Sequence, residues 1–406
     1  MNPDRAVRQK KFLAIAAEHA EDFKTRVAQH DRENSFAHEN VAAMKASGYT
    51  NMTAPAELGG GGADADVLDE VLAQERLARG DLPTAISINM HLFAVGWLGD
   101  LWRAGGRREG GLRTFLESII RDRLILGGGV SDPKINSMLG FGGVLNTSRR
   151  AEKVAGGYLV NGTGRFSTMC AAADFLFETA RYDDPASGPV ILNFYLPIKT
   201  PGIKMQNNWD TMSIRASASH DVVWENVFLP EETANRRPLG VWDQPMNIFC
   251  RWNPSLEACY LGLAQAARDW AFAWTGQRRQ EPFEQPMSHY PQNQFLAAEI
   301  EIGLRAARAM LLQTATAVAD TPVGDEQPLM DIIACHHFVM ETAVSVVDKT
   351  MRMVGGAGLF KSNPLEQMYR DVRAGIVHQP FQGYDALAWL GKLAFGIPHD
   401  TLPRWV

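Results

Sequence analysis

Near its C-terminus the chain reads Gly355-Gly356-Ala357-Gly358, then Arg370-Asp371-Val372-Arg373, then His378-Gln379-Pro380-Phe381. Glycine has no Cβ, so a backbone rich in glycine can approach a cofactor closely, although a helix C-terminus also ends in glycine. Here the glycines follow a long periodic segment and precede Pro364. This stretch predicts a helix that ends at a backbone able to contact a ligand.

Hydrophobic periodicity divides the chain into three parts. Residues 5–121 carry apolar residues at helical spacing, interrupted by glycine-rich turns. From 124 to about 230, short β-branched or alternating runs separated by Gly, Asn and Asp indicate an all-β module. Long periodic stretches then predict a helical bundle over 256–278, 292–320 and 329–354. We predict domains at 1–123, 124–235 and 236–406.

Composition narrows the classes of function. The chain has 406 residues, 46% hydrophobic and 21% charged, which suits two or three globular domains. The net charge of -6 and the scattered Lys and Arg give no reason to expect nucleic-acid binding. We expect no signal peptide and no membrane span. The four cysteines form no zinc pattern, so we predict no metal site and a reducing, cytoplasmic location.

Further motifs, taken with the C-terminal stretch, resemble the acyl-CoA dehydrogenase family of flavoproteins. Pro55-Ala56-Glu57-Leu58-Gly59-Gly60 is similar to the family's P-x-E-x-G-G turn, and Ile214-Arg215-Ala216-Ser217-Ala218-Ser219 is similar to its late β segment. The resemblance covers roughly residues 55–391. It implies an N-terminal helical domain, a central β-barrel and a C-terminal four-helix bundle that bind FAD as a homodimer or homotetramer.

Two segments resemble the part of the family that holds the flavin ring. Val130-Ser131-Asp132-Pro133 is similar to the V-T-E-P loop, which implies that Val130 and Ser131 hydrogen-bond the pyrimidine end, where charge accumulates on reduction. Arg165-Phe166-Ser167-Thr168 is similar to a K-x-W-I-T segment. The resemblance implies that Phe166 lies against the flavin edge, with Ser167 beside it, and that the Thr168 hydroxyl lies near flavin N5.

Other motifs resemble the part that holds the phosphates. Arg278 or Arg279, followed by Phe283 and Gln292, is similar to R-x-x-F-G…Q, and we favour Arg279. The resemblance implies that this arginine, together with Gly355 and Gly356, reaches the FAD pyrophosphate of a neighbouring subunit, a task that suits a guanidinium. A solvated arginine pair is the alternative interpretation. Arg352 stands where the family has a glutamine, and a cation there could also serve the cofactor.

The expected catalytic base is missing. Counting from Arg370-Asp371, the glutamate that removes the substrate α-proton in the family falls on Gln379, which cannot accept a proton. A second base position in the family falls near Trp252, which we place at the substrate with Ser137, the counterpart of a serine that touches the pantetheine arm. Glu257 is a candidate relocated base, with a solvated helical glutamate as the alternative.

His378 opens another possibility. The spacing from Arg370 and Arg373 to His378 and Pro380 resembles the flavin monooxygenase branch of the same fold, in which a histidine near the flavin assists the chemistry of oxygen. Three functions therefore stay open. They are an acyl-thioester dehydrogenase with an electron-transfer partner, a monooxygenase that uses FAD or FMN with a flavin reductase, and a non-catalytic flavoprotein scaffold.

Overall fold

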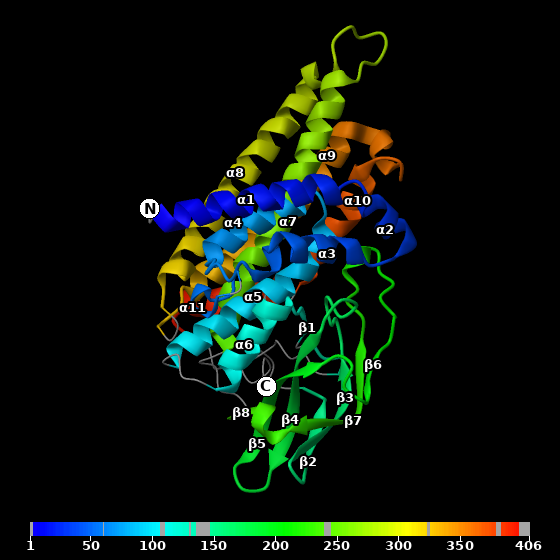
Figure 1. Cartoon of the computed structure of the whole chain (residues 1–406). Helices are drawn as coiled ribbons and strands as arrows, with labels where there is room; N and C mark the ends of the chain where they lie inside the picture. The colour runs from blue at the N-terminus through cyan, green and yellow to red at the C-terminus, as the bar shows by residue number, and fades with distance from the viewer. Residues whose placement is uncertain are drawn as a thin grey trace.

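The computed structural model describes residues 3–59, 61–105, 110–129, 131–134, 147–238, 245–322, 325–378 and 383–397. In Figure 1 the helices fill one part of the molecule and the sheet forms the other. Helices precede the sheet and follow it along the chain, as the periodicity predicts. Val130, Ser137 and Gln379 lie outside the described residues.

The N-terminal part consists of helices with recognisable start signals. Helix α4 begins after Asp66, which forms a capping box with Asp69. Helix α5 begins after Asp81, whose carboxylate accepts the Thr84 N–H, and it has a proline in its first turn. The six helices are α1 (Pro3–Phe23), α2 (Val27–Glu33), α3 (His38–Ser47), α4 (Val67–Ala78), α5 (Leu82–Ala104) and α6 (Gly111–Asp122).

The middle part is an eight-stranded sheet in the order β6-β7-β3-β2-β4-β5-β8, with β1 beside β4. The prediction of a closed barrel is wrong. The end strands, β6 (Ile203–Met205) and β8 (Asn235–Pro238), pair only with β7 and β5 among the described residues, so the sheet is open. The other strands are β1 (Leu126–Gly128), β2 (Arg150–Val154), β3 (Gly157–Gly164), β4 (Phe175–Asp184), β5 (Gly188–Pro197) and β7 (Val222–Pro230).

The C-terminal part is helical. Helix α7 packs on α8 and α9, and it also packs on α4 of the N-terminal part. A Cβ at Gly262 would lie 2.3 Å from the Glu75 carbonyl oxygen, so this glycine lets α7 and α4 approach closely. The helices are α7 (Pro245–Gln277), α8 (Pro291–Asp320), α9 (Leu329–Val354), α10 (Pro364–Asp371) and α11 (Gly383–Ala394).

One segment, 329–359, is long and apolar enough to cross a membrane by length and composition. However, 56% of its apolar window is buried inside the protein, as expected for a helix of a folded core. One apolar cluster joins the N-terminal and C-terminal helices, from Phe12 to Val372, and a second fills the sheet around Trp224. The two helical parts therefore share a core. The sheet has a core of its own, and a third apolar cluster joins α5 and α6 to it through Leu126 of β1.

A buried ion network lies where α7 begins. The Arg251 guanidinium, 8% exposed, contacts Glu70 at 2.7 Å and Asp100 at 2.9 Å, and it donates to the Ala65 carbonyl at 2.7 Å. A Cβ at Gly96 on α5 would lie 2.2 Å from Arg251 Nε, so only glycine leaves room for this side chain. The network fixes α4, α5 and α7 relative to one another.

Candidate functional site

Two segments with strained backbones meet at the edge of the sheet that faces the helices. Phe166 and Met169 have φ values of 55° and 70°, and Ile214 and Ala218 both have 46°. Non-glycine residues rarely adopt positive φ, and such residues gather at functional sites. The segments hold each other through the Met169 N–H, which donates to the Ser217 carbonyl at 3.4 Å. The concentration of strain marks 165–170 and 214–219 as one site.

Phe166 is presented to the outside of this site. Its side chain is 50% exposed and stands edge-on to Trp209, with ring centroids 5.9 Å apart. A Cβ at Gly129 would lie 3.1 Å from the Phe166 carbonyl oxygen, so the chain after β1 passes close to this residue. An exposed aromatic ring on a strained backbone is what a wall for a planar cofactor requires.

The Thr168 hydroxyl is held by a partner that the sequence analysis did not single out. Thr168 Oγ1 lies 2.9 Å from Ser219 Oγ, and Ser219 Oγ lies 2.8 Å from Ser217 Oγ. All three hydroxyls are buried. The Ser131 carbonyl accepts the Arg165 N–H at 3.2 Å, which joins the Ser131 loop to the same site. The structure therefore brings together Ser131, Phe166, Ser167 and Thr168.

Two aromatic rings pack together between the helices α5 and α7. Trp252 on α7 and Phe93 on α5 have ring centroids 5.7 Å apart. Nearby, His91 is fully buried and uses both ring nitrogens, because Nε2 lies 2.8 Å from the Thr50 carbonyl and Nδ1 accepts the Leu126 N–H at 3.1 Å. Burial lowers the pKa of His91 to about 4, so this residue is neutral at neutral pH.

Glu257 lies in the core of the C-terminal helices. Its side chain is 0% exposed. The Cys335 thiol donates to Glu257 Oε2 at 3.0 Å, and His336 Nδ1 lies 3.4 Å from Oε1. Both partners belong to α9 and are also buried. The carboxylate is therefore occupied by α9 rather than presented to a substrate, and it is not the solvated glutamate of the alternative interpretation either.

His378, at the end of the short 3₁₀ segment Val372–Val377, is anchored by Tyr260 of α7. The Tyr260 hydroxyl lies 2.9 Å from His378 Nδ1. Loss of hydration, and secondly the nearby His336, lowers the pKa of His378 to about 4. Burial raises the pKa of Tyr260 far above its usual value, so the phenol keeps its proton. At neutral pH this pair is uncharged.

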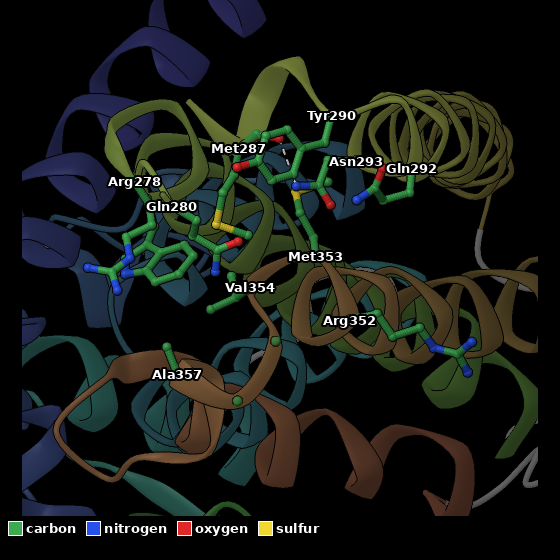
Figure 2. Close-up of a pocket in the computed structure, with 13 residues that line it drawn as sticks. Arg278, Gln280, Met287, Tyr290, Gln292, Asn293, Arg352, Met353, Val354 and Ala357 are labelled. Atoms are coloured by element: carbon green, nitrogen blue, oxygen red, sulfur yellow. Dashed lines mark hydrogen bonds between the residues drawn. The ribbon is translucent and has the colours of Figure 1, made fainter. Parts of the chain in front are cut away.

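A second group of predicted residues lines a cavity of about 360 Å³ at the far end of α7. Figure 2 shows Arg278 and Arg352 on opposite sides of it, with their guanidinium groups pointing away from each other. Arg352 is paired with Asp348 at 2.8 Å. Arg279, which the sequence analysis favoured, is not among the lining residues. These are Trp274, Arg278, Gln280, Met287, Tyr290, Gln292, Asn293, Arg352, Met353, Val354, Gly355, Gly356 and Ala357.

The cavity has an open glycine floor. A Cβ at Gly355 or Gly356 would meet no atom within 4 Å among the described residues. Arg278 lines the cavity, and so does Arg352, which stands at the family's glutamine position. The structure therefore brings one of the two candidate arginines together with Arg352 and the glycine pair.

The two groups of residues lie at opposite ends of one long helix. Trp252 is near the start of α7, and Trp274, in the cavity, is near its end. At 1.5 Å per residue they are about 33 Å apart along the helix. In Figure 1 the end of α7 and the start of α8 project from the side of the molecule opposite the sheet. Trp252 and the cavity are therefore separated by most of the length of α7.

Comparisons with known proteins agree with this architecture. Residues 8–105 match the model for the acyl-CoA dehydrogenase N-terminal domain, and residues 255–383 match that for the acyl-CoA dehydrogenase C-terminal domain. YdbM of Bacillus subtilis (strain 168), named provisionally as an acyl-CoA dehydrogenase, is 34% identical over 92% of this chain and 93% of its own length.

Proteins that are not named as acyl-CoA dehydrogenases are also among the similar proteins. The amino sugar nitrososynthase RubN8 of Streptomyces rubradiris is 28% identical over 96% of this chain and 90% of its own. The structure of KijD3 in complex with FMN and a dTDP-linked amino sugar has a TM-score of 0.85 and 27% identity, covering 99% of this chain and 96% of that chain. The fold is thus shared by proteins with different reactions.

Proposed function

The chain belongs to the acyl-CoA dehydrogenase family, and on that premise we propose that this flavoprotein oxidoreductase is a monooxygenase that uses reduced flavin and dioxygen. Under this proposal a separate flavin reductase supplies the reduced flavin, and the substrate is an organic molecule held against Trp252 and Phe93. The proposal ranks the oxygen reaction above the dehydrogenation of an acyl thioester, the reaction that the family name suggests.

The observation that carries this proposal is the position of Glu257. Removal of a weakly acidic α-proton requires a carboxylate within hydrogen-bond reach of the substrate. Counted along the sequence, the two positions at which the family keeps that carboxylate fall on Gln379 and near Trp252, and neither residue is a base. Glu257 was the remaining candidate, and it is fully buried in the helical core, where Oε2 accepts the Cys335 thiol and Oε1 lies 3.4 Å from His336 Nδ1. A dehydrogenase of the usual kind therefore lacks its base.

His378 is suited to hydrogen bonding rather than to proton abstraction. An imidazole whose pKa is about 4 is a weak base, so it removes an α-proton poorly. Tyr260 holds its Nδ1, which favours the tautomer with the proton on Nε2. A neutral N–H donor at a site poor in water can stabilise negative charge that develops on oxygen. We assign His378 that role, with Tyr260 as its positioning residue.

The residues at the sheet edge fit a flavin. The half-exposed Phe166 ring supplies a wall, and the close approach of Gly129 to Phe166 leaves no room for a side chain between them. Ser131 and Thr168 supply polar groups beside that wall. When bound and reduced, a flavin supplies two electrons and two protons to dioxygen, so that one oxygen atom enters the substrate and the other leaves as water.

Dehydrogenation of an acyl thioester, with an electron-transfer partner, is the second candidate. It is favoured by the name of the 34% identical relative. The oxygen reaction is favoured by the nitrososynthases and by FMN-bound KijD3, which are similar over almost the whole chain. The flavin released by denaturing the purified protein identifies FMN or FAD directly by chromatography.

An anaerobic mixing experiment separates the two candidates. Oxidised protein is mixed with acyl-CoAs of different chain length while the visible flavin absorbance is followed. We expect no bleaching. In the second arm, protein with reduced FMN and dioxygen is given a panel of amines, sulfides and phenols, and we expect a product heavier by one oxygen atom. Bleaching by any thioester would overturn the proposal in favour of dehydrogenation.

The variant Gln379→Glu sharpens the same test. It restores a carboxylate at the family's first base position, so it should fold normally and gain activity with an acyl-CoA if a thioester fits the site. Under the monooxygenase proposal we expect no such gain. Reduction of this variant by a thioester that leaves the wild type oxidised would show that only the base separates this chain from a dehydrogenase.

We further propose that the cavity at the end of α7 serves the flavin of a second copy of the chain. The support is the separation of about 33 Å between the two groups of residues along α7, given 1.5 Å per residue. Under this proposal a dimer or larger assembly would complete each site from two chains, with Phe166 from one chain and Arg278 from the other. Sedimentation velocity tests this. A monomer that binds flavin tightly would contradict it.

A further inference from the structure

The sheet contains a fully buried ion pair directly behind the Phe166 loop. Arg149 and Glu178 are both 0% exposed, and Arg149 Nη2 lies 2.9 Å from Glu178 Oε2. Arg149 Nε also donates to the Thr179 carbonyl at 2.6 Å. Burying two charges is costly, and an apolar pair of similar size often stabilises a protein as well. Because stability alone does not explain a buried ion pair, we consider a functional role for this one, which lies next to the site formed by residues 165–170 and 214–219.

Three contacts lead from this pair to the site. Ser167 Oγ donates to Glu178 Oε1 at 3.4 Å, so the middle residue of Phe166-Ser167-Thr168 rests on the carboxylate. A Cβ at Gly164 would lie 2.6 Å from Arg149 Nη1, so β3 reaches the pair just before the loop begins. Ser167 also donates its N–H to the His220 carbonyl at 3.0 Å, which links the loop to the strained segment opposite.

The pair is also connected to the Ser131 loop. Asp132 Oδ2 accepts the Thr147 hydroxyl at 2.9 Å and the Ser148 N–H at 2.6 Å. Thr147 Oγ1 in turn accepts the Arg149 N–H at 3.2 Å. The Phe166 loop therefore contacts the Glu178 carboxylate directly through Ser167. The Ser131 loop instead contacts the backbone of the segment that carries Arg149, through Asp132, Thr147 and the Arg149 backbone N–H.

We propose that the Arg149–Glu178 pair is a positioning device that fixes the Phe166-Ser167-Thr168 loop and the Ser131 loop relative to each other and to the flavin. Neither side chain reaches the cofactor itself, because both are fully enclosed by the sheet. Their effect passes directly to the Phe166 loop through Ser167 and Gly164, and to the Ser131 loop through the backbone of residues 147–149. The proposal rests on the assignment of this loop to the flavin, and it holds for a monooxygenase and a dehydrogenase alike.

The test compares Glu178→Gln, Ser167→Ala and the double variant by titrating each apoprotein with FMN and with FAD. Glu178→Gln should fold, because burial raises the pKa of Glu178 to about 7 and the wild-type chain itself approaches the neutral form. Each single variant should weaken flavin binding about tenfold, the effect of losing a hydrogen bond to a charged group. Both should shift the visible absorption of the bound flavin in the same way.

The double variant supplies the readout that a general loss of stability would not produce. If the carboxylate acts through Ser167, the double variant should bind flavin as each single variant does, because the two changes break one link. Glu75→Gln is the matched control. It neutralises another buried acid, paired with Arg308 at 2.7 Å on α8, and should leave flavin binding and absorption unchanged.

Each outcome decides the matter. The proposal would be overturned if the double variant lost as much flavin affinity as the two single variants added together. It would also be overturned if Ser167→Ala bound flavin as tightly as the wild type. This second test can still be made if Glu178→Gln does not fold. Phe166→Ala separates this failure from a failure of the site itself. If Phe166→Ala weakens flavin binding and the other variants do not, the positioning proposal is wrong. If Phe166→Ala has no effect, the loop does not face the flavin and both proposals fall.

Discussion

Helix α7 begins in a tightly packed region and ends in an open one. At its start, Arg251 is enclosed by Glu70, Asp100 and the Ala65 carbonyl, and Gly96 leaves no space for even a methyl group. At its end, Arg278 is exposed, and Gly355 and Gly356 face open space. We infer that the first region fixes geometry for chemistry, whereas the second gains its contacts only when a ligand or a second chain arrives.

The largest expected effect tests the packing at the start of α7. Gly96→Ala places a methyl group where Arg251 lies, so it should lower the free energy of unfolding by about 3–5 kcal/mol by breaking a buried ion pair. Gly276→Ala is the control, a helical glycine near the other end of α7 with nothing within 4 Å of its Cβ position. It should stabilise by about 0.5–1 kcal/mol. Urea unfolding measures both changes in the free energy of unfolding. Equal changes would mean that the start and the end of α7 are packed equally tightly.

The next effect is a dependence on pH. The folded pKa of His91 is about 4, against 6.5 when unfolded, so only the unfolded chain gains this proton between those values. Stability contributed by neutral His91 is present above pH 6.5 and is lost as pH falls towards 4, by about 2 kcal/mol at pH 5. Burial raises the pKa of Glu70 and of Glu178 to about 7, and these groups act in the opposite direction.

Comparison with His91→Gln isolates the histidine, because the carboxyl groups are common to both proteins. The variant should be less stable than the wild type at pH 7. Between pH 7 and pH 5 it should lose about 2 kcal/mol less of its free energy of unfolding than the wild type loses. Parallel pH profiles for the two proteins would mean that His91 carries a proton in the folded state.

A smaller effect tests the open end. Arg278→Ala should weaken flavin binding about tenfold, because a guanidinium pairs strongly with phosphate, without a change in the stability of the apoprotein. Arg279→Ala is the matched control, since Arg279 is also exposed but does not line the cavity. Isothermal titration with flavin measures both variants. If only Arg279→Ala lost flavin affinity, Arg279 would be the phosphate-binding arginine, as the sequence suggested.

The smallest effect concerns the glycine floor. Gly356→Ala meets no neighbouring atom, so it should change the free energy of unfolding of the apoprotein by less than about 0.5 kcal/mol. If a flavin approaches this backbone, the same methyl group should weaken binding severalfold. An unchanged flavin affinity would show that the ligand does not touch this part of the cavity.

The fold was largely predictable because periodicity is a strong signal in long elements. Helix α9 spans Leu329–Val354, the range predicted. Helix α7 begins at Pro245, eleven residues before the predicted start at 256, because the chain continues as a helix through Pro254. The packing of Arg251 and its neighbours outweighs the backbone hydrogen bond that Pro254 cannot donate. This packing cannot be recognised from the apolar pattern of one helix. Closure of the sheet depends on its short end strands, β6 and β8, which are too short to carry a recognisable alternating apolar pattern in the sequence.

The site was predictable only where a motif carries it. Phe166 and Thr168 were predicted from their resemblance to a family motif, and that prediction stands untested, whereas Ser219 became significant only when its hydroxyl was seen against Thr168. Helical spacing gave Glu257 as a candidate base, but burial depends on contacts with α9, more than 70 residues away in the chain. The adjacent residues Arg278 and Arg279 differ in the direction in which their side chains point. That direction is set by the turn between α7 and α8.

The separation of the two groups of residues along α7 has a genetic consequence. In an assembly with two-fold symmetry, a chain defective at Phe166 and a chain defective at Arg278 fail alone, because each supplies only one working half to every site. Mixed in one cell, they form hybrids in which one site combines both defects and the other combines both intact halves. Two inactive alleles would then complement each other, and the amount of restored activity would measure the fraction of hybrid assemblies.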